Sequence, residues 1–560
     1  MPQLLHLPGE LLARVISHID QSALKQLRQT CRTLAQFVSR ELFRTVHLFP
    51  DEESYERVRN ISNNTILRSL VRKIYINTCY KDSEWGDPDC TLTEPFKDAI
   101  LQLKRFPNVQ STVLRFDKNC CVDDDGVEMW RSEWPQPPTY REEVLHVFFS
   151  WLTSLDVPTK ELGICNLQDL TIKDTDTRAM MAKVLCGLQS LRLNIATEHH
   201  EASPEEDLEF PEPHEFFAEM PFAWLKPTMG SLEHLTIYCD NYWGFFPKLD
   251  LKGIHFPRLK TLALGNFGFA QDAHVEWIVS HEATLAELYL DDCTILYDVG
   301  ITKENIGRCS FEKTEMEVRI REDCPSLSKH YRSYEKRWHD LFDTFRTRLP
   351  LLRHFRMGTT CWSDGMPFEK EANINIGLMN DRYMVCYDGY GPSPYMTGRG
   401  NARDNEKVAP ECDEEDRNAL RLLLQSIGQS APESWSILHS KHDAPPPRLH
   451  PATKLTKRSS VYFIVNELNL RQRLNSQSPS LRNQLLVYCD IFPYPEALIP
   501  PKGDSAAEAF PMECIICHLD GFLLCLEAIQ PQRRAKDLLL TRQHGGYHSR
   551  NDCGREKFSR

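Results

Sequence analysis

The sequence predicts an α/β protein in which an all-helical N-terminal unit precedes an irregular solenoid of repeated strands and a mixed C-terminal cap. Three observations lead to this fold class: apolar residues at helical spacing in the first fifty positions, a recurring leucine pattern, and a proline-rich stretch near residue 445. The 560 residues leave room for more than one domain. We expect the helical unit at 1–50, the solenoid at 65–360, its cap at 361–440, and a linker with a poorly patterned C-terminal region at 441–560.

The first fifty residues predict two short helices. Pro8 suits a helix start, because a first-turn residue loses no hydrogen bond by lacking an N–H. Asp20 interrupts the apolar pattern, and Ser22 is the expected N-cap of the second helix. The apolar residues at helical spacing are Leu11, Leu12, Val15, Ile16 and Ile19, then Leu24, Leu27, Cys31, Leu34 and Val38. A unit this small needs cover for its apolar faces from the rest of the chain or from another protein.

This stretch resembles the F-box motif of the substrate receptors of SCF ubiquitin ligases. The resemblance rests on Leu7-Pro8, Glu10-Leu11-Leu12, Ile16, Leu24, Leu27, Cys31-Arg32, Leu34 and Leu42-Phe43-Arg44. It implies a small helical hook that binds the Skp adaptor, which in turn links it to the cullin scaffold. The residues expected to contact the adaptor are Leu7, Pro8, Leu11, Leu12, Ile16, Leu24, Leu27, Cys31 and Leu34. The alternative is an ordinary helical hairpin packed on the following domain.

A pattern of the form Leu-x-x-Leu-x-Leu recurs along the next three hundred residues. Its copies occupy 167–172, 188–193, 232–237, 259–264, 285–290 and 352–357, and related patterns surround 69–78 and 106–116. The closest copies lie on the order of 20 to 30 residues apart, which is the period of leucine-rich repeats. In such a solenoid the three apolar residues enter a shared core and each strand is followed by a returning helix, as we expect for 273–280. Chance leucine spacing is the alternative.

The region after the repeats predicts a longer helix, a strand and a second helix. Residues 331–349 carry Trp338, Leu341, Phe342 and Phe345 at helical spacing. With the last repeat and the aromatic segment 382–392, they resemble the fungal F-box proteins that have divergent leucine-rich repeats. An acidic turn at 412–416 precedes apolar residues up to 427, an arrangement that the helix dipole favours. The linker is expected at 442–451.

Composition and cysteine usage narrow the function classes. The net charge is −13, and without a long basic patch we expect no nucleic-acid partner. The apolar stretch 512–529 contains charged residues and is too short for a membrane span, so no membrane partner is expected. The 19 cysteines form no disulfide framework, and the first residues do not read as a signal peptide. We therefore expect reduced thiols and a cytoplasmic or nuclear location.

No catalytic signature survives inspection, so we expect neither an enzyme nor a cofactor. Phosphate-binding loops and nucleophile elbows are missing, and the spacing around 121–132 does not fit a calcium loop. Cys514 and Cys517 could hold zinc together with His544 and His548, but the gap is about twice that of a typical finger. Unpaired thiols in an apolar helix are the favoured interpretation, and no metal site is predicted.

The residues between the core positions of the repeats are expected to project from the sheet and to bind a target protein. By this count Asp169, Thr171 and Lys173 share one strand. Tyrosine offers contact area and a polar tip, which makes it frequent at binding hot spots. The predicted target-binding residues are Arg192, His234, Tyr238, Glu287, Tyr289 and Asp291. The alternative is that they are merely solvated strand positions.

Together these features predict a substrate-recognition adaptor of an SCF-type ubiquitin ligase. The F-box would bind the Skp adaptor and, through it, cullin, while the solenoid would hold an unknown target protein. Two other classes stay open: a protein-interaction scaffold outside any ligase, and an enzyme hidden in the C-terminal region.

Overall fold

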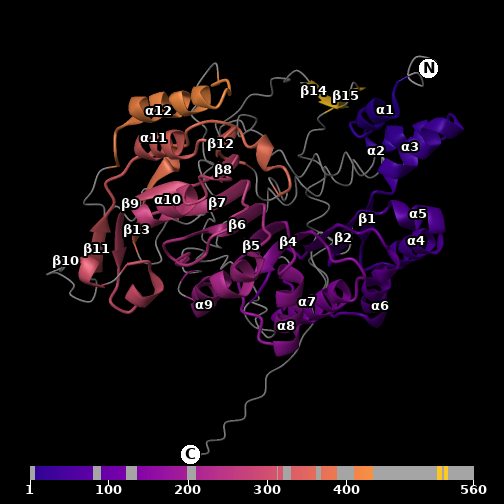
Figure 1. The fold of residues 1–560 in the computed structure, drawn as a ribbon, viewed down its shortest axis with the longest axis horizontal. Coiled ribbons are helices and arrows are strands. Elements are labelled where there is room, and N and C mark those ends of the chain that lie inside the picture. Colours follow the sequence, from indigo (N-terminus) through magenta and orange to yellow (C-terminus); the bar gives the residue numbers. More distant parts are fainter. Residues whose placement is uncertain are drawn as a thin grey trace, which may run out of the picture. The chain divides into compact units, whose positions relative to one another are not determined.

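Three short helices open the part of the chain that the structure describes (Figure 1). The computed structural model describes residues 7–79, 90–121, 135–198, 208, 210–311, 313–319, 329–360, 368–387, 409–432, 514–519 and 522–527. The helices are α1 (Gly9–Ile16), α2 (Gln21–Leu27) and α3 (Arg32–Leu42). We call residues 9–42 the hook. Contacts divide the chain into two compact units, residues 1–446 and 447–560.

The hook has one helix more than the sequence predicts. The predicted second helix is interrupted at Cys31, whose extended backbone (φ −158°) begins α3. The predicted N-cap is also wrong by two positions. Asp20 caps α2, because its Oδ1 accepts the Ala23 N–H at 2.9 Å and the Ser22 hydroxyl at 2.7 Å.

A parallel sheet follows the hook, with its strands in chain order. Each strand pairs in parallel with the next, and the sheet is open. The strands are β1 (Thr45–Leu48), β2 (Lys73–Asn77), β3 (Ser111–Arg115), β4 (Glu161–Gln168), β5 (Ser190–Ala196), β6 (His234–Trp243), β7 (Thr261–Phe269), β8 (Glu287–Asp291) and β12 (His354–Gly358). The predicted succession of strands is thereby confirmed.

Helices return the chain between most successive strands, but none lies in the described residues between β6 and β7. They are α4 (Glu52–Asn63), α5 (Thr65–Leu70), α6 (Glu94–Gln102), α7 (Pro138–Thr153), α8 (Thr175–Leu185), α9 (Pro211–Met220), α10 (Asp272–Val279) and α11 (Trp338–Arg348). Asp51, Asn64, Thr93 and Asp174 cap four of these helices through their side chains. In Figure 1, α6, α7 and α8 follow one another along the sheet. We call the sheet face opposite these helices the inner face.

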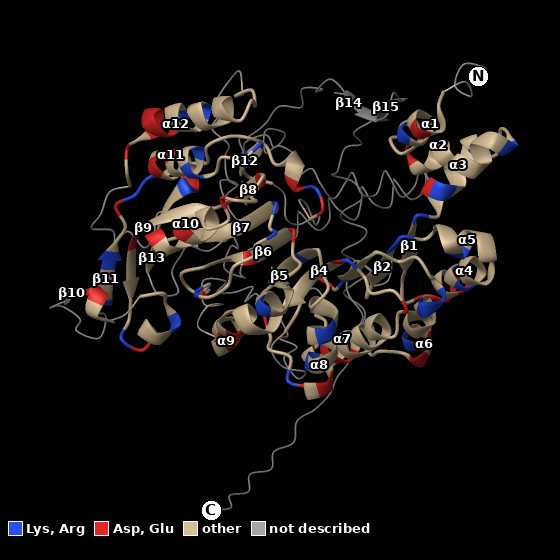
Figure 2. Cartoon of the chain, in the orientation of Figure 1, with Lys and Arg blue, Asp and Glu red and all other residues tan. Residues whose placement is uncertain are grey.

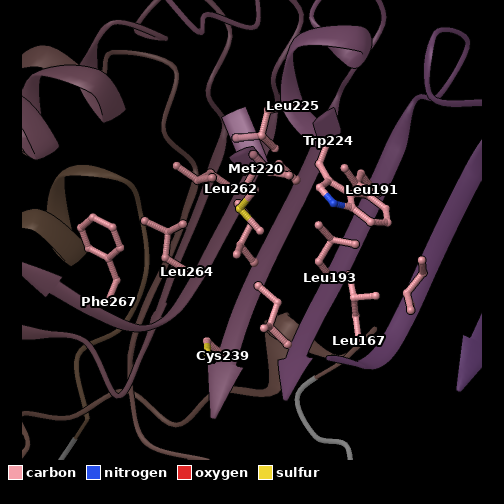
Figure 3. Close-up of a cluster of buried hydrophobic side chains, with 14 of the residues drawn as sticks. Leu167, Leu191, Leu193, Met220, Trp224, Leu225, Cys239, Leu262, Leu264 and Phe267 are labelled. Carbon is pink, nitrogen blue, oxygen red and sulfur yellow. The ribbon is translucent and has the colours of Figure 1, made fainter. Parts of the chain in front are cut away.

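The leucine pattern fills the core between the sheet and the helices. Leu191 and Leu193 of β5 and Leu262 and Leu264 of β7 belong to one buried cluster with Trp224, which lies in the helical turn after α9 (Figure 3). The copies at 188–193, 232–237, 259–264, 285–290 and 352–357 place all three apolar residues in the interior. The copy at 167–172 is wrong in register, because β4 ends at Gln168. Asp169 and Thr171 therefore lie beyond the strand.

Apart from β12, the strands that follow β8 in the first unit form a branch from the main ladder. The end of β7 pairs with β9 (Thr294–Ile301), which also pairs with β11 (Lys329–Ser333) and β13 (Tyr383–Tyr387), while β10 (Glu317–Arg319) pairs with β11. The predicted helix over 331–349 is thus too long, since its first residues belong to β11 and α11 starts at Trp338. Helix α12 (Asp413–Ser426) is confirmed, with the acidic first turn visible in Figure 2.

The second unit contributes a strand pair to the described residues. Strands β14 (Cys514–Leu519) and β15 (Phe522–Glu527) are antiparallel. The helix expected around Cys514 and Cys517 is therefore wrong, while His544 and His548 lie outside the described residues. Within the described ranges, no helix has the length and apolar character to cross a membrane.

Candidate functional site

The hook has an apolar interior and a separate apolar surface. Leu12 and Ile16 of α1 are buried against α2 and α3, whereas Leu11 and Val15 are 49% and 41% exposed. Because Leu11 and Val15 are four residues apart on one helix, their side chains are neighbours on its outer side. An exposed pair of large aliphatic side chains is a natural contact for a protein partner.

Some of the residues predicted to bind the adaptor lie on the surface of the hook, and others lie in its interior. Pro8 and Leu11 are exposed, and Leu7, Leu27 and Cys31 are partly buried beside the hook core. Four more belong to the interior: Leu12, Ile16, Leu24 and Leu34. The prediction omitted Val15, although its spacing from Leu11 is a signal that the sequence contains. The outer surface of α1 consequently carries the exposed large apolar side chains of the hook.

The inner face is a ladder of aligned positions across the main sheet. Paired residues follow one another from β1 to β12 without a shift at two levels. One level contains Thr45, Lys73, Ser111, Glu161, Ser190, His234, Thr261, Glu287 and His354. The other contains His47, Tyr75, Val113, Gly163, Arg192, Thr236, Ala263, Tyr289 and Arg356.

Three of the predicted target-binding residues are covered. Tyr238, Tyr289 and Asp291 are 1%, 3% and 0% exposed, so the expectation that they face solvent is wrong. For the two tyrosines the cause is residues 368–374, which we call the crossing segment. Its Ile374 packs with Tyr238, Ala263 and Tyr289 in one apolar cluster. The sequence places these tyrosines on the inner face but does not reveal what lies on top of them.

Arg192 and His234 are brought together at a buried carboxylate. Glu371, 5% exposed, accepts from Arg192 Nε at 3.0 Å and from the Thr236 hydroxyl at 2.7 Å. His234 Nε2 lies 3.5 Å from the same Glu371 oxygen. Burial opposes ionisation of Glu371, but the hydrogen bond from His234 and the charge of Arg192 outweigh it and hold the pKa near 2. The carboxylate is therefore fixed in its charged form.

The contacts of His234 define which ring nitrogen carries the proton. The Arg192 guanidinium lies 2.9 Å from Nδ1 through its NH2 group, and a guanidinium can only donate. Nδ1 is consequently the acceptor, which places the proton of the neutral ring on Nε2, 3.0 Å from the Thr236 hydroxyl. His234 therefore belongs to the polar network that holds Glu371.

The remaining predicted residues interact with neighbours on the same face. Glu287 Oε2 accepts from the Thr261 hydroxyl at 2.9 Å and from the Tyr289 hydroxyl at 3.2 Å. Burial and the nearby charge of Glu287 raise the pKa of Tyr289. Asp291 accepts a hydrogen bond from the Thr360 hydroxyl. These side chains are thus organised by the protein itself before any target arrives.

Sequence reasoning missed a buried polar centre that ties α12 to α11 and β13. Asp416, fully buried, accepts from His339 Nδ1 at 3.0 Å, Arg382 Nε at 2.9 Å and the Tyr383 hydroxyl at 2.9 Å. With Cys412, Asp416 and His339 place possible metal ligands within 4.8 Å of one another. The Arg382 cation already compensates the Asp416 charge, so this cluster has the character of a structural ion pair.

Comparison with known families gives an assignment for the hook. Residues 4–48 match the family model described as F-box-like, which confirms the resemblance to F-box proteins over this region. The match indicates a role in protein interaction or in SCF-type ubiquitin ligases, since F-box domains generally bind Skp-type adaptors. No curated protein matches the chain.

Proposed function

We propose that this protein is a substrate-recognition adaptor of an SCF-type ubiquitin ligase. The observation that carries the proposal is the F-box-like match of residues 4–48 together with the exposed Leu11 and Val15 on α1. About half of each side chain is still exposed, so covering it with a Skp-type adaptor would contribute about 1 kcal/mol each. The adaptor would link the hook to cullin.

In this proposal the main sheet holds a target protein and contributes no chemistry of its own. The parallel strands form an irregular leucine-rich solenoid of the type found in fungal F-box proteins, and binding brings the target close to a ubiquitin-charged enzyme. His234, Arg192 and Glu287 lie on the face assigned to the target. Free thiols such as Cys165 and Cys239 fit a reducing compartment, the cytoplasm or the nucleus.

Co-purification of the Skp adaptor and cullin with the full chain tests the proposal. The wild type should retain both proteins, and Leu11→Asp should lose both because it places a carboxylate in an apolar interface. Phe222→Asp is the matched control, because Phe222 is 66% exposed and lies outside the hook. Adaptor without cullin would support a scaffold outside any ligase, and retention of the adaptor by Leu11→Asp would contradict the assignment.

A further inference from the structure

The crossing segment runs across the strands of the inner face. It reaches β2 through Glu369, which bonds to Lys73 and to the Tyr75 hydroxyl. Its middle reaches β5 and β6 through Glu371, and its end reaches β7 and β8 through Ile374. It therefore spans most of the face to which target binding was assigned.

Two small residues of the sheet receive two large residues of the segment. The Phe368 ring lies over Gly163, where an added Cβ would be 2.8 Å from the ring. Ile374 packs over Ala263 between Tyr238 and Tyr289. In a row that otherwise carries larger side chains, such as Arg192 and Tyr289, Gly163 and Ala263 are the positions that leave room for these two residues of the segment.

The charges of the segment and the face are complementary. Glu369 pairs with Lys73, and both side chains are 22% exposed. Glu371 pairs with Arg192, with 7% and 16% of the side chains exposed. Opposite charges attract each other more strongly where water is excluded, and removing one partner leaves the other charge uncompensated. The face is thus built to receive two carboxylates at fixed positions.

Side chains, rather than a strand ladder, hold the segment on the face. The backbone N–H groups of Asn373 and Ile374 bond within the segment, to the carbonyls of Lys370 and Glu371. Backbone attachment begins at its C-terminal end, where Arg356 donates to the Ile374 carbonyl at 2.8 Å and the Gly377 N–H donates to Met357 at 2.9 Å. Recognition of residues 368–374 therefore depends on which side chains they carry.

We propose that the inner face is a receptor for an acidic linear peptide of the target, and that the crossing segment occupies this receptor in its place. The peptide would present an aromatic residue, carboxylates one and three positions later, and an aliphatic residue six positions later, as Phe368, Glu369, Glu371 and Ile374 do. This inference rests on the proposed function, because it names the chemistry of the target that the ligase would recognise.

Because the crossing segment belongs to the same chain, it should weaken the binding of a free target peptide by a predictable amount. A segment in the same chain competes at an effective concentration in the millimolar range, so a target peptide binds the small fraction of molecules whose face is open. Weakening the tethered copy should raise the affinity for a free copy by at least tenfold. A segment that cannot leave the face would produce no such gain.

Fluorescence anisotropy with a labelled peptide of residues 368–376 tests this on the full chain. Glu369→Ala with Glu371→Ala should bind the peptide at least tenfold more tightly than the wild type. A peptide with glutamine at both glutamate positions, or the further change Arg192→Ala in the protein, should abolish the gain. Equal affinity of wild type and variant, or equal binding of the glutamine peptide, would overturn the proposal.

A second measurement tests the proposal even if the double variant does not fold. In the wild type, saturating peptide should increase hydrogen exchange at the amides of 369–374, and unchanged exchange would refute displacement. The Leu11→Asp variant separates this inference from the proposed function. It should lose the Skp adaptor and keep the peptide affinity, so failure of either claim is seen independently of the other.

Discussion

The hook and the inner face both carry large side chains that could contact a partner, but their exposure to solvent differs. Leu11 and Val15 on α1 are 49% and 41% exposed, whereas Tyr238 and Tyr289 on the sheet are 1% and 3% exposed. The difference arises from sequence separation. The hook core is formed by residues close in the chain, and the sheet face is covered by a segment 135 residues from Thr236 and 179 from Arg192. A position that projects from a sheet is therefore not necessarily a free position.

The largest expected effect comes from removing the two covered tyrosines. Tyr238→Ala with Tyr289→Ala should lower the free energy of unfolding by about 5 kcal/mol, because it leaves a cavity under Ile374. Solvated tyrosines would leave the melting temperature almost unchanged. Chemical denaturation measures the loss, and Phe222→Ala at an exposed site is the control. A change within 1 kcal/mol would contradict the buried position of the pair.

The interior of the hook should be nearly as sensitive. Ile16→Asp places a carboxylate where the side chain is 1% exposed, which should cost about 4 kcal/mol of local stability. Hydrogen exchange should rise throughout residues 9–42 and stay unchanged in β4 to β7. Protection retained in α2 and α3 would show that the hook core does not depend on Ile16.

The buried carboxylate under the crossing segment should make stability depend on pH. The pKa of Glu371 is near 2 in the folded protein and ordinarily 4.5, so its stabilising effect is full above 4.5 and is lost as the pH falls toward 2. The loss should be roughly 3 kcal/mol. Glu371→Gln should remove this part of the acid dependence in denaturation curves, and equal acid sensitivity of both proteins would contradict the assignment.

A buried and an exposed ion pair should also differ in their coupling energies. The coupling energy of Arg192 and Glu371 in a double-mutant cycle should be about 2 kcal/mol, because both groups are screened from water. Arg348 and Glu276 form an exposed pair at 2.7 Å and should couple by less than about 1 kcal/mol. Similar coupling in both pairs would remove the special role of the inner-face network.

Local patterns predicted much of the fold. The leucine copies located β5, β6, β7, β8 and β12, and the acidic turn located α12, because strand and helix patterns are local. At β4 the pattern failed: Asn166 adopts φ +55°, the pairing register shifts there, and Leu170 and Ile172 lie beyond the end of the strand at Gln168. The expected helix from residue 331 failed because pairing with β9 makes its first residues a strand.

The candidate site was harder to predict from the sequence than the fold was. The side of the sheet was correct for Arg192, His234 and Glu287, since alternation fixes it. The cover by Phe368, Glu371 and Ile374 could not be predicted, because no periodicity links a loop to strands more than a hundred residues away.

The most direct test of the account is the affinity of the Skp adaptor for the full chain, measured by calorimetry with Leu11→Asp. This substitution at an exposed site should change the stability of the chain by less than about 0.5 kcal/mol. The account predicts that adaptor binding falls at least a hundredfold while the melting temperature and the affinity of Phe222→Asp stay at wild-type values. Wild-type affinity in Leu11→Asp would contradict the claim that the outer surface of α1 binds the adaptor.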